Sequence, residues 1–575
     1  MNGVNFVMTI PLIKKVKLNS SISTIYNEIT TDSLSSAASV LHIINNRFID
    51  CIMHCNNLSV LNLQHTTVST IEDCPILYSL MIVQNDKMKS ITLNSIREVY
   101  LSNMPNCTLI EMDNVEVVKI SNLPKLNHIL LKNAITISLD NVGDVCPILS
   151  KSFMKAVTID LNNIGNFHIF ESFSFASLRY LTFRTCHNIK SLNCIDNLNM
   201  LIIEDCNSLK EVINIACETS ISITNCKSLI KVESVAVNSI NIDRCSSLRR
   251  IKDIATCQLT IEYCFGLSTL STSECESVKI VKCPALIKIN IDNVLRFITI
   301  DTCESLSYVE FSPIDTHSYN DLSIQLYGDT HFTEIKDWYV SKLDIQNNSS
   351  IESIGNIYNL TDLTIIDCRE LELLSDVSVI GDLYLEFCPA LEEVQNVYGF
   401  NNLSIIDCSA LESIEMYLVK IENLNITNCE NLTFTLMCQN LKSLILYNCG
   451  PVHLCELPLA CIVHINNASL LPDVSSGDVS NKEEPAALLV RNHIQEMMNS
   501  AYMISRCISK FLTRNRYLNY MKFKKKYNVY DCPICQEHIP IHYFTITPCD
   551  HIFHSNCLHE WLKIKRTCPL CNKNQ

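Results

Sequence analysis

The sequence has little glycine and no long apolar run, and both shortages exclude whole classes of protein. Glycine accounts for 10 of the 575 residues and proline for 16, so the chain is neither collagen-like nor a Pro/Gly-rich disordered polymer. Because no apolar stretch reaches the roughly 18 residues of a membrane-spanning helix, we predict no membrane span. The segment from Met1 to Lys17 lacks a basic leading region and an Ala-x-Ala pattern, which argues against a secretory signal.

Cysteine, by contrast, is abundant, with 31 residues. Because nothing in the sequence routes the chain to an oxidising compartment, we expect thiols or metal ligands rather than disulfides. The expected location is the cytoplasm or the nucleus, or the host cytoplasm if the source is a virus. Hydrophobic residues make up 47% of the 575 residues, which suits a large buried core and a repeat array with a small module attached.

The formal charge of −15 is distributed unevenly. Residues 1–486 hold 55 acidic and 32 basic side chains, a net of −23. Residues 487–530 hold one acidic and nine basic side chains, a net of +8, and residues 531–575 hold four of each. The acidic body argues against nucleic acid as its main partner, and the basic segment needs a separate explanation.

One phrase, apolar-x-apolar-x-x-Cys, recurs at steps of 19 to 21 residues, for example from Leu201 to Cys206. Its regular copies end at Cys186, Cys206, Cys226, Cys245, Cys264, Cys283, Cys303, Cys368, Cys388, Cys408, Cys429 and Cys449. Other residues take the cysteine position, which we call the slot, at Asn46, Thr66, Asn85, Met104, Tyr327, Asn348 and Ala468. Such self-similarity at a fixed period is the signature of a repeat architecture.

The spacing predicts the shape of each repeat. The alternating apolar pair indicates a short strand with two inward side chains, and the slot residue can satisfy backbone polar groups where the chain turns inward. The period and the exchange of Cys for Asn resemble the leucine-rich repeat. This resemblance implies an α/β-type solenoid dominated by parallel β-strands, with short 3₁₀ or extended segments opposite the sheet. We expect structural repeat cysteines, with disulfides between neighbouring turns as the alternative.

The sequence divides into five parts by composition. A segment rich in Ser, Pro and acidic residues follows the last repeat and indicates a flexible linker. We assign residues 1–37 to an N-terminal cap, 38–470 to a solenoid of about 22 repeats, 471–485 to the linker, 486–526 to a basic amphipathic helix and 530–575 to a terminal module.

The predicted helix at 486–526 contains neither proline nor glycine, and its apolar residues have helical spacing. Its basic residues favour either a solvated helix face or docking on an acidic protein, on the acidic solenoid, on nucleic acid or on a membrane surface. The apolar residues are Leu489, Ile494, Met497, Met498, Ile504, Ile508, Phe511 and Leu512, and the late bases are Arg506, Lys510, Arg514, Arg516, Lys522, Lys524, Lys525 and Lys526.

The terminal module carries eight candidate metal ligands in four closely spaced pairs. Zinc takes thiolate and imidazole ligands in a tetrahedron, so four pairs supply two complete sites. We therefore predict two structural Zn²⁺ ions, whose binding provides folding energy that so short a segment lacks. The residues alone allow sequential or interleaved pairing. The eight ligands are Cys532, Cys535, Cys549, His551, His554, Cys557, Cys568 and Cys571.

All eight positions resemble the RING family, in its RING-H2 variant. The PHD finger uses a single histidine and fits this pattern less well. The resemblance implies interleaved sites, the first formed by Cys532, Cys535, His554 and Cys557 and the second by Cys549, His551, Cys568 and Cys571.

RING domains act as ubiquitin ligases that hold a ubiquitin-loaded conjugating enzyme and form no covalent intermediate, so the resemblance implies no catalytic side chain. It implies an apolar docking groove at Ile534, Trp561, Pro569 and the adjacent Leu570, although Trp561 would also suit a small core. Many active members place Arg or Lys directly after the last ligand as a linchpin. This chain has the uncharged Asn572 there, which weakens the expected intrinsic activity.

The combination predicts a leucine-rich-repeat and RING type E3 ubiquitin-protein ligase. In this hypothesis the solenoid binds a protein substrate, and the RING module delivers ubiquitin from a conjugating enzyme to substrate lysines. The alternative is a non-catalytic protein-binding scaffold whose RING module is only structural. A ubiquitin-conjugating enzyme and ubiquitin are the partners in the first hypothesis.

Overall fold

The structure is a computed structural model of the 575-residue chain. It describes residues 15–18, 22–25, 33–36, 39–143, 155–164, 177–292, 294–312, 322–338, 340–399, 401–417, 421–437, 440–455, 458, 460–468, 532–535, 544–546, 551–565 and 567–571. The chain divides into two compact units, Met1–Lys252 and Asp253–Gln575.

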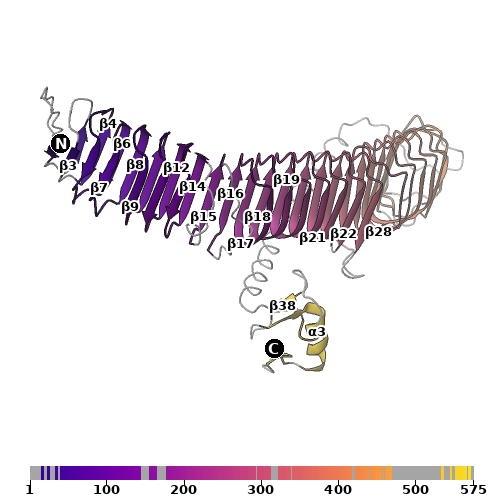
Figure 1. Ribbon diagram of the computed structural model, residues 1–575. Helices are drawn as coiled ribbons and strands as arrows, with labels where there is room; N and C mark the ends of the chain where they lie inside the picture. Colours follow the sequence, from indigo (N-terminus) through magenta and orange to yellow (C-terminus); the bar gives the residue numbers. More distant parts are fainter. Residues whose placement is uncertain are drawn as a thin grey trace. The chain divides into compact units, whose positions relative to one another are not determined.

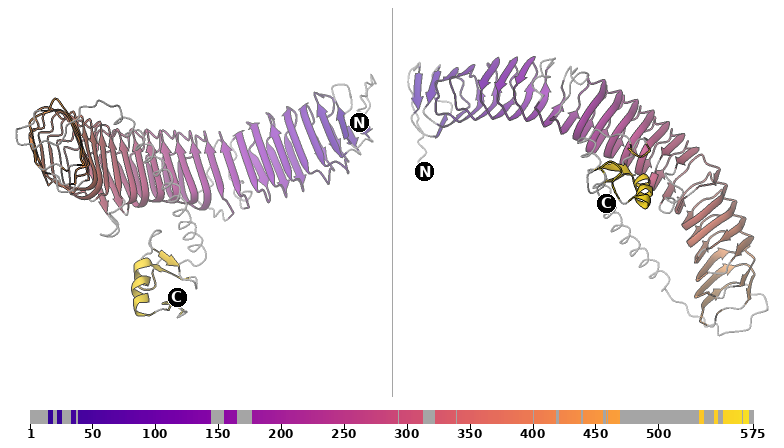
Figure 2. Two further views of the ribbon diagram at one scale, coloured as in Figure 1. Left: turned by 180° about the vertical axis from the view of Figure 1, so that it is seen from behind. Right: turned by 90° about the horizontal axis from the view of Figure 1, so that it is seen from below.

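The first unit is a stack of parallel strands, visible as the indigo to purple part of Figures 1 and 2. Its strands are β1 (Lys15–Leu18), β2 (Ile22–Ile25), β3 (Ser33–Ser36), β4 (Val40–Ile44), β5 (Cys51–Met53), β6 (Val60–Thr66), β7 (Thr70–Glu72), β8 (Ser79–Asn85), β9 (Ser90–Asn94), β10 (Glu98–Ser102), β11 (Leu109–Asp113), β12 (Val117–Leu123), β13 (His128–Leu131), β14 (Thr136–Val142), β15 (Thr158–Asn162), β16 (Tyr180–Arg184), β17 (Ser191–Glu204), β18 (Glu211–Thr224) and β19 (Lys231–Asp243).

The second unit is also a stack of parallel strands and contains the terminal module; its first strand begins at Arg250, three residues before Asp253. Its solenoid strands are β20 (Arg250–Glu262), β21 (Thr269–Val281), β22 (Lys288–Asp292), β23 (Val294–Asp301), β24 (Tyr308–Ser312), β25 (Ser323–Tyr327), β26 (Glu334–Lys336), β27 (Lys342–Gln346), β28 (Ser353–Ile366), β29 (Leu373–Glu386), β30 (Glu393–Tyr398), β31 (Asn402–Ile406), β32 (Ser413–Tyr417), β33 (Asn423–Cys429), β34 (Phe434–Met437), β35 (Ser443–Cys449), β36 (Val452–Cys455) and β37 (Ile462–Asn466). The module adds β38 (Phe544–Ile546), β39 (Ile552–His554) and the helix α3 (Ser555–Ile564).

Turns such as that of β12 and β13 contribute separate strands to two parallel sheets, whereas β17, β18 and β19 are single strands of 14, 14 and 13 residues whose pairing contains register shifts. β12 pairs with β10 and β14 in one sheet, whereas β13, the next strand along the chain, pairs with β11 in the other. Alternate side chains of both strands point into the space between the sheets, so Val118, Ile120, Ile129 and Leu131 are at most 1% exposed. Burying one such side chain contributes roughly 1.5–3 kcal/mol, and each turn depends on its neighbours to complete that burial.

The residue before the slot bends the chain into the core by adopting a left-handed conformation. Asn225 has φ 54° before Cys226, and the equivalent residues of most described turns are also left-handed. Asn and Asp tolerate this region better than other non-glycine residues, and they dominate the position. The corner amides also stack, since Asn122 donates from Nδ2 to Asn103 Oδ1 at 2.9 Å and Asn141 donates to Asn122 Oδ1 at 2.8 Å.

The slot satisfies buried backbone groups, as the sequence predicts. Asn85 accepts from the backbone N–H groups of Lys87 (3.0 Å) and Met88 (2.9 Å), and it donates to the Val68 carbonyl at 2.8 Å. At Cys206 the thiol lies 3.4 Å from the Glu204 carbonyl oxygen. Both side chains are fully buried, and the exchange of Cys for Asn therefore reflects two ways to meet one requirement.

The prediction of a solenoid dominated by parallel strands is confirmed, but its α/β description needs correction. The only helix that the structure assigns within the described residues is α3, in the terminal module. A turn of about 20 residues leaves no room for a helix beside two strands and two corners, so the segment opposite the first sheet forms a second parallel sheet instead.

Two further details differ from the sequence interpretation. The slot predicted at Tyr327 is wrong by three residues, because Ile324 and Leu326 pair with the inward residues of β27 and the buried slot residue is Thr330. An extra residue after β25 displaces the slot. The segment assigned to the cap contains β2, which pairs with β4.

The predicted linker at 471–485 and the predicted helix at 486–526 lie outside the described residues.

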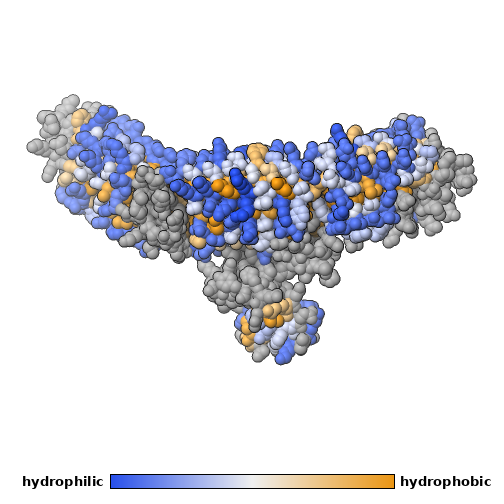
Figure 3. Space-filling view, turned by 45° about the vertical axis from the view of Figure 1, so that its right-hand side comes forward, coloured by the Kyte–Doolittle hydropathy of each residue, from blue (hydrophilic) through white to orange (hydrophobic). Residues whose placement is uncertain are grey.

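On the face of the described solenoid that Figure 3 shows, polar residues predominate and apolar residues are interspersed among them. Large exposed hydrophobic residues such as Phe48, Tyr180 and Ile380 occur singly along the repeats. Scattered side chains of this kind are normal for a folded protein.

Candidate metal centre

The terminal module is built around a hairpin, a helix and a small core. β38 and β39 pair antiparallel, with Phe544 opposite His554, and α3 follows β39 directly. Phe553 and Leu558 are buried together with the cysteines at 532 and 568. Leu558 and Leu562 are one helical turn apart and face this core, which explains why the short segment 555–564 forms a helix.

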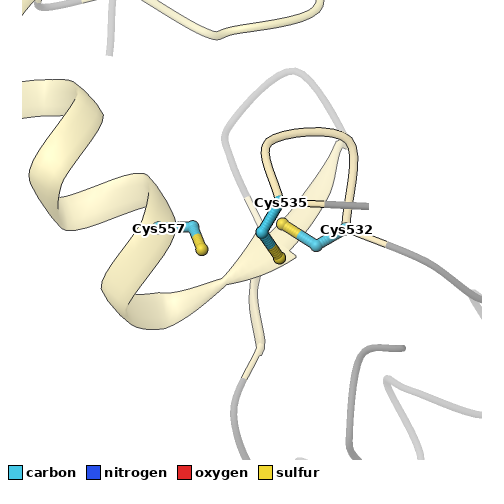
Figure 4. Close-up of side chains that lie close together, drawn as sticks. All are labelled: Cys532, Cys535 and Cys557. Atoms are coloured by element: carbon cyan, nitrogen blue, oxygen red, sulfur yellow. The ribbon is translucent and has the colours of Figure 1, made fainter. Parts of the chain in front are cut away.

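Three cysteine side chains from two elements point toward one another (Figure 4). Cys532 and Cys535 come from a turn, and Cys557 comes from the first turn of α3. Their sulfur atoms all lie within 4.8 Å of one another. Burial is the largest cause that raises the pKa of the Cys557 thiol, to about 12, followed by the hydrogen bond with Cys535 and the charge on Cys532. Three adjacent thiols resist ionisation unless a cation offsets their charge.

A second group combines one imidazole with two thiols. His551, Cys568 and Cys571 place their ligand atoms within 4.8 Å of one another, and His551 Nδ1 lies 3.6 Å from Cys568 Sγ. His551 comes immediately before β39, whereas the two cysteines belong to the turn near the end of the described chain. Residues 17 positions apart in the sequence thus meet at one point.

Each group combines residues of two ligand pairs that are not neighbours in the sequence. The first contains both residues of the first ligand pair and one of the third, Cys557. The second contains one residue of the second pair, His551, and both of the fourth. Cys549 lies outside the described residues, as does the side chain of His554, although the backbone of His554 is described as the last residue of β39.

Both groups fit zinc by their donor chemistry and their spacing. Thiolate and imidazole are the preferred zinc ligands, and a tetrahedral site with Zn–S bonds of about 2.3 Å holds its ligand atoms roughly 4 Å apart. Among the described residues, these are the groups of three or more Cys, His, Asp or Glu side chains close enough to share an ion. The module therefore carries zinc-binding clusters, and the buried solenoid cysteines form none in the described part of the chain.

The residues predicted to contact a conjugating enzyme occupy different environments. Ile534 packs partly buried against the small core, whereas Leu570 is 53% exposed, and Pro569 is half-buried in the same turn. Trp561 is half-buried and lies outside the core cluster, with its indole Nε1 donating to the Thr567 carbonyl at 2.8 Å. Asn572 lies outside the described residues.

Sequence interpretation missed one neighbour of the tryptophan. The Lys565 ammonium lies 5.6 Å from the centre of the Trp561 ring, and its backbone N–H donates to the Trp561 carbonyl at 2.9 Å. A cation over an indole is attracted by the ring's electron density. The spacing of four residues at the end of a helix was the available signal.

None of the described helices is long and apolar enough to cross a membrane.

Comparison with known proteins locates similarity in the terminal module. The model of the Ring finger domain family matches residues 530–572. The chain is 37% identical over 78 residues to transmembrane E3 ubiquitin-protein ligase FLY2 of Arabidopsis thaliana, covering 12% of this chain and 14% of that protein. It is 42% identical over 50 residues to RING finger protein 24 of Homo sapiens, covering 8% and 34%, and 46% identical over 41 residues to RING finger protein 145 of Homo sapiens, covering 7% and 6%.

The chain thus spans only 6% to 34% of the length of these curated relatives, and the similarity identifies its terminal module as a RING-type zinc finger.

Proposed function

We propose that this protein is a RING-type E3 ubiquitin ligase. The observation that carries the proposal is the pair of interleaved groups, one of three cysteines and one of a histidine and two cysteines, in the segment that matches the Ring finger family. Relatives whose matching segments are RING modules are named as ubiquitin ligases. In this proposal His554 completes the first zinc site and Cys549 completes the second. Each ion then has four protein ligands, which leaves no position for a reactive water and makes both ions structural.

The ligase acts by positioning rather than by a catalytic side chain. A conjugating enzyme charged with ubiquitin docks on Ile534, Trp561, Pro569 and Leu570, and the module holds it so that a substrate lysine can attack the thioester. The 53% exposed Leu570 supplies apolar contact area. The hydrogen bond from Trp561 Nε1 to the Thr567 carbonyl fixes the ring at the end of α3, so the docking surface is preorganised.

The solenoid serves in this proposal as the surface that selects a protein substrate. Its outward side chains are polar and varied along two sheets, and repeat arrays of this kind present extended binding surfaces. We further propose that its turns are related to leucine-rich repeats, on the basis of the Cys and Asn exchange at the slot, and that the protein works in a reducing compartment such as the cytoplasm. The described solenoid cysteines are thiols that are not joined in disulfides, which suits that location.

A reconstituted ubiquitination reaction tests the ligase proposal. The full chain is incubated with ubiquitin, activating enzyme, ATP and each of several conjugating enzymes, and ubiquitin chains are followed by blotting. We expect activity from the wild type, none from Cys535→Ala, and a loss of at least about tenfold from Trp561→Ala with retained zinc. The exposed His559 on α3 provides a matched control, since His559→Ala should retain activity. Absence of chains with every conjugating enzyme would refute the proposal.

The second candidate is a protein-binding scaffold with a structural RING module. The uncharged Asn572 at the linchpin position favours it, because a charged donor there would bridge ubiquitin and conjugating enzyme more strongly. A pull-down with the charged conjugating enzyme separates the two. Binding by the wild type supports the ligase, whereas binding only by Asn572→Arg supports the scaffold.

A further inference from the structure

In β37, the last described strand of the solenoid, the inward side chains are less buried than in the strand that pairs with it. In β35 the inward residues Leu444 and Leu446 are at most 1% exposed. Their partners in β37, Val463 and Ile465, are only half-buried, and Ile462 is 61% exposed. The core therefore reaches the surface at β37.

The other end of the described repeats differs. The inward residues of β4, Leu41 and Ile43, are 0% exposed, because β2 pairs with β4 on its outer side. β37 pairs with β35 on one side, and no strand in the described part of the chain pairs with it on the other. A sheet edge with exposed apolar residues invites pairing with another chain, and repeat proteins normally cover such an end.

The sequence that follows β37 supplies a segment suited to cover it. Val490, Ile494, Met497, Ala501, Ile504, Ile508 and Phe511 recur at alternating steps of four and three residues. On a helix they form one apolar stripe, which we call the cap stripe. The basic Arg506 and Lys510 fall between its positions, on the side that would face solvent.

The chain between the two elements is long enough for them to meet. From Asn466 to Val490 there are 24 residues, which can span up to about 80 Å when extended. A contact within one chain also benefits from the high effective concentration that a short linker provides, in the millimolar range. A second copy of the protein has no such advantage at low concentration.

We propose that the cap stripe of residues 490–511 packs on β37 and closes the C-terminal end of the solenoid. One intramolecular contact then covers both the half-exposed core at Val463 and Ile465 and the apolar stripe. The RING module is consequently tethered to the capped end by residues 512–531, a reach of at most about 70 Å. This inference does not depend on the ligase activity.

Hydrogen exchange on the full-length protein tests the cap. The variant Ile504→Asp/Ile508→Asp places two charges on the cap stripe, and Ser505→Asp/Ser509→Asp places the same charges beside it. We expect amides of 461–467 to exchange about tenfold faster in the first variant and at the wild-type rate in the second. Strands β28 and β29 should keep wild-type exchange in both, which shows that the solenoid remains folded.

The dependence of exchange and molecular mass on protein concentration distinguishes the intramolecular cap from a second copy of the protein bound at β37. Light scattering and exchange are measured at low and high protein concentration. A monomer with protection independent of concentration supports the proposal. Protection at 461–467 that appears only with dimer formation would assign the end to a second copy, and equal exchange in the wild type and the stripe variant would show that the stripe does not cover β37. Either result overturns the proposal.

Discussion

The solenoid and the terminal module are both rich in cysteine and use it in opposite ways. In the solenoid the slot places one thiol in each regular turn, fully buried against backbone carbonyls, as at Cys303 and Cys368. Burial raises the pKa values of these two thiols to about 11 and 12, so they stay protonated. In the module three ligand atoms converge within 4.8 Å. The number of donors that meet at one point, and not the residue type, separates a packing thiol from a zinc ligand.

Removing one cysteine from each region tests most strongly whether the two sets of cysteines have different roles. Cys535→Ala would leave the proposed first zinc site with three ligands, and we expect ubiquitin transfer to fall at least about 100-fold because the proposed docking surface would lose its fold. Cys226→Ala removes a buried slot thiol and should cost the solenoid roughly 1–2 kcal/mol without affecting transfer. Rates are measured with a charged conjugating enzyme in a single-turnover assay. Equal losses in both variants would contradict the division of roles.

A second test compares the two residues that share the slot. Asn348 accepts from the backbone N–H of Ser350 at 3.0 Å and donates to the Gly328 carbonyl at 3.0 Å, whereas the slot cysteine at 368 lies 3.8 Å from the carbonyl of Ile366. Asn348→Ala leaves buried backbone groups without partners and should destabilise its turn by about 2–3 kcal/mol. Cys368→Ala should cost about 1 kcal/mol.

Local hydrogen exchange around β27 and β28 measures both changes, since a repeat array need not unfold in one step. A larger loss from Cys368→Ala would argue against hydrogen bonding as the role of the slot.

Local spacing was enough to predict the slot, the inward strand residues and the six candidate ligands that the described structure brings together. Leu201 and Ile203 are buried as the repeated phrase requires. The strand segments on the opposite side were harder to predict from the sequence, since no recurring residue such as the slot cysteine accompanies their inward residues, for example Val212. The left-handed corner could have been predicted from the Asn or Asp that often precedes the slot, but the repeated phrase did not include that position.

The terminal module shows a different limit. Spacing alone left the ligand pairing open, because pairing depends on how distant segments meet in space. The structure groups Cys557 with the first pair and His551 with the fourth. The predicted contacts with a conjugating enzyme rested on family resemblance, since neither composition nor periodicity indicates a binding role for Trp561 and Leu570.

The smallest expected effect concerns a corner that breaks the Asn and Asp preference. Phe387 precedes the slot at Cys388 with φ 59° and is 51% exposed. The left-handed region costs an ordinary side chain roughly 1–2 kcal/mol, and Asn tolerates it better. Phe387→Asn should therefore stabilise the turn by about 0.5–1 kcal/mol, read as slower exchange in β29. Destabilisation would show that the phenylalanine packs more favourably than the corner geometry suggests.

Zinc content of the purified full-length protein tests the account most directly. Elemental analysis of the wild type should give two zinc ions per chain, and Cys226→Ala should retain both. Cys535→Ala should lose at least one. A wild-type protein without bound zinc, or a Cys535→Ala variant that keeps the full amount, would contradict the assignment of the terminal cysteines as metal ligands and the solenoid cysteines as packing residues.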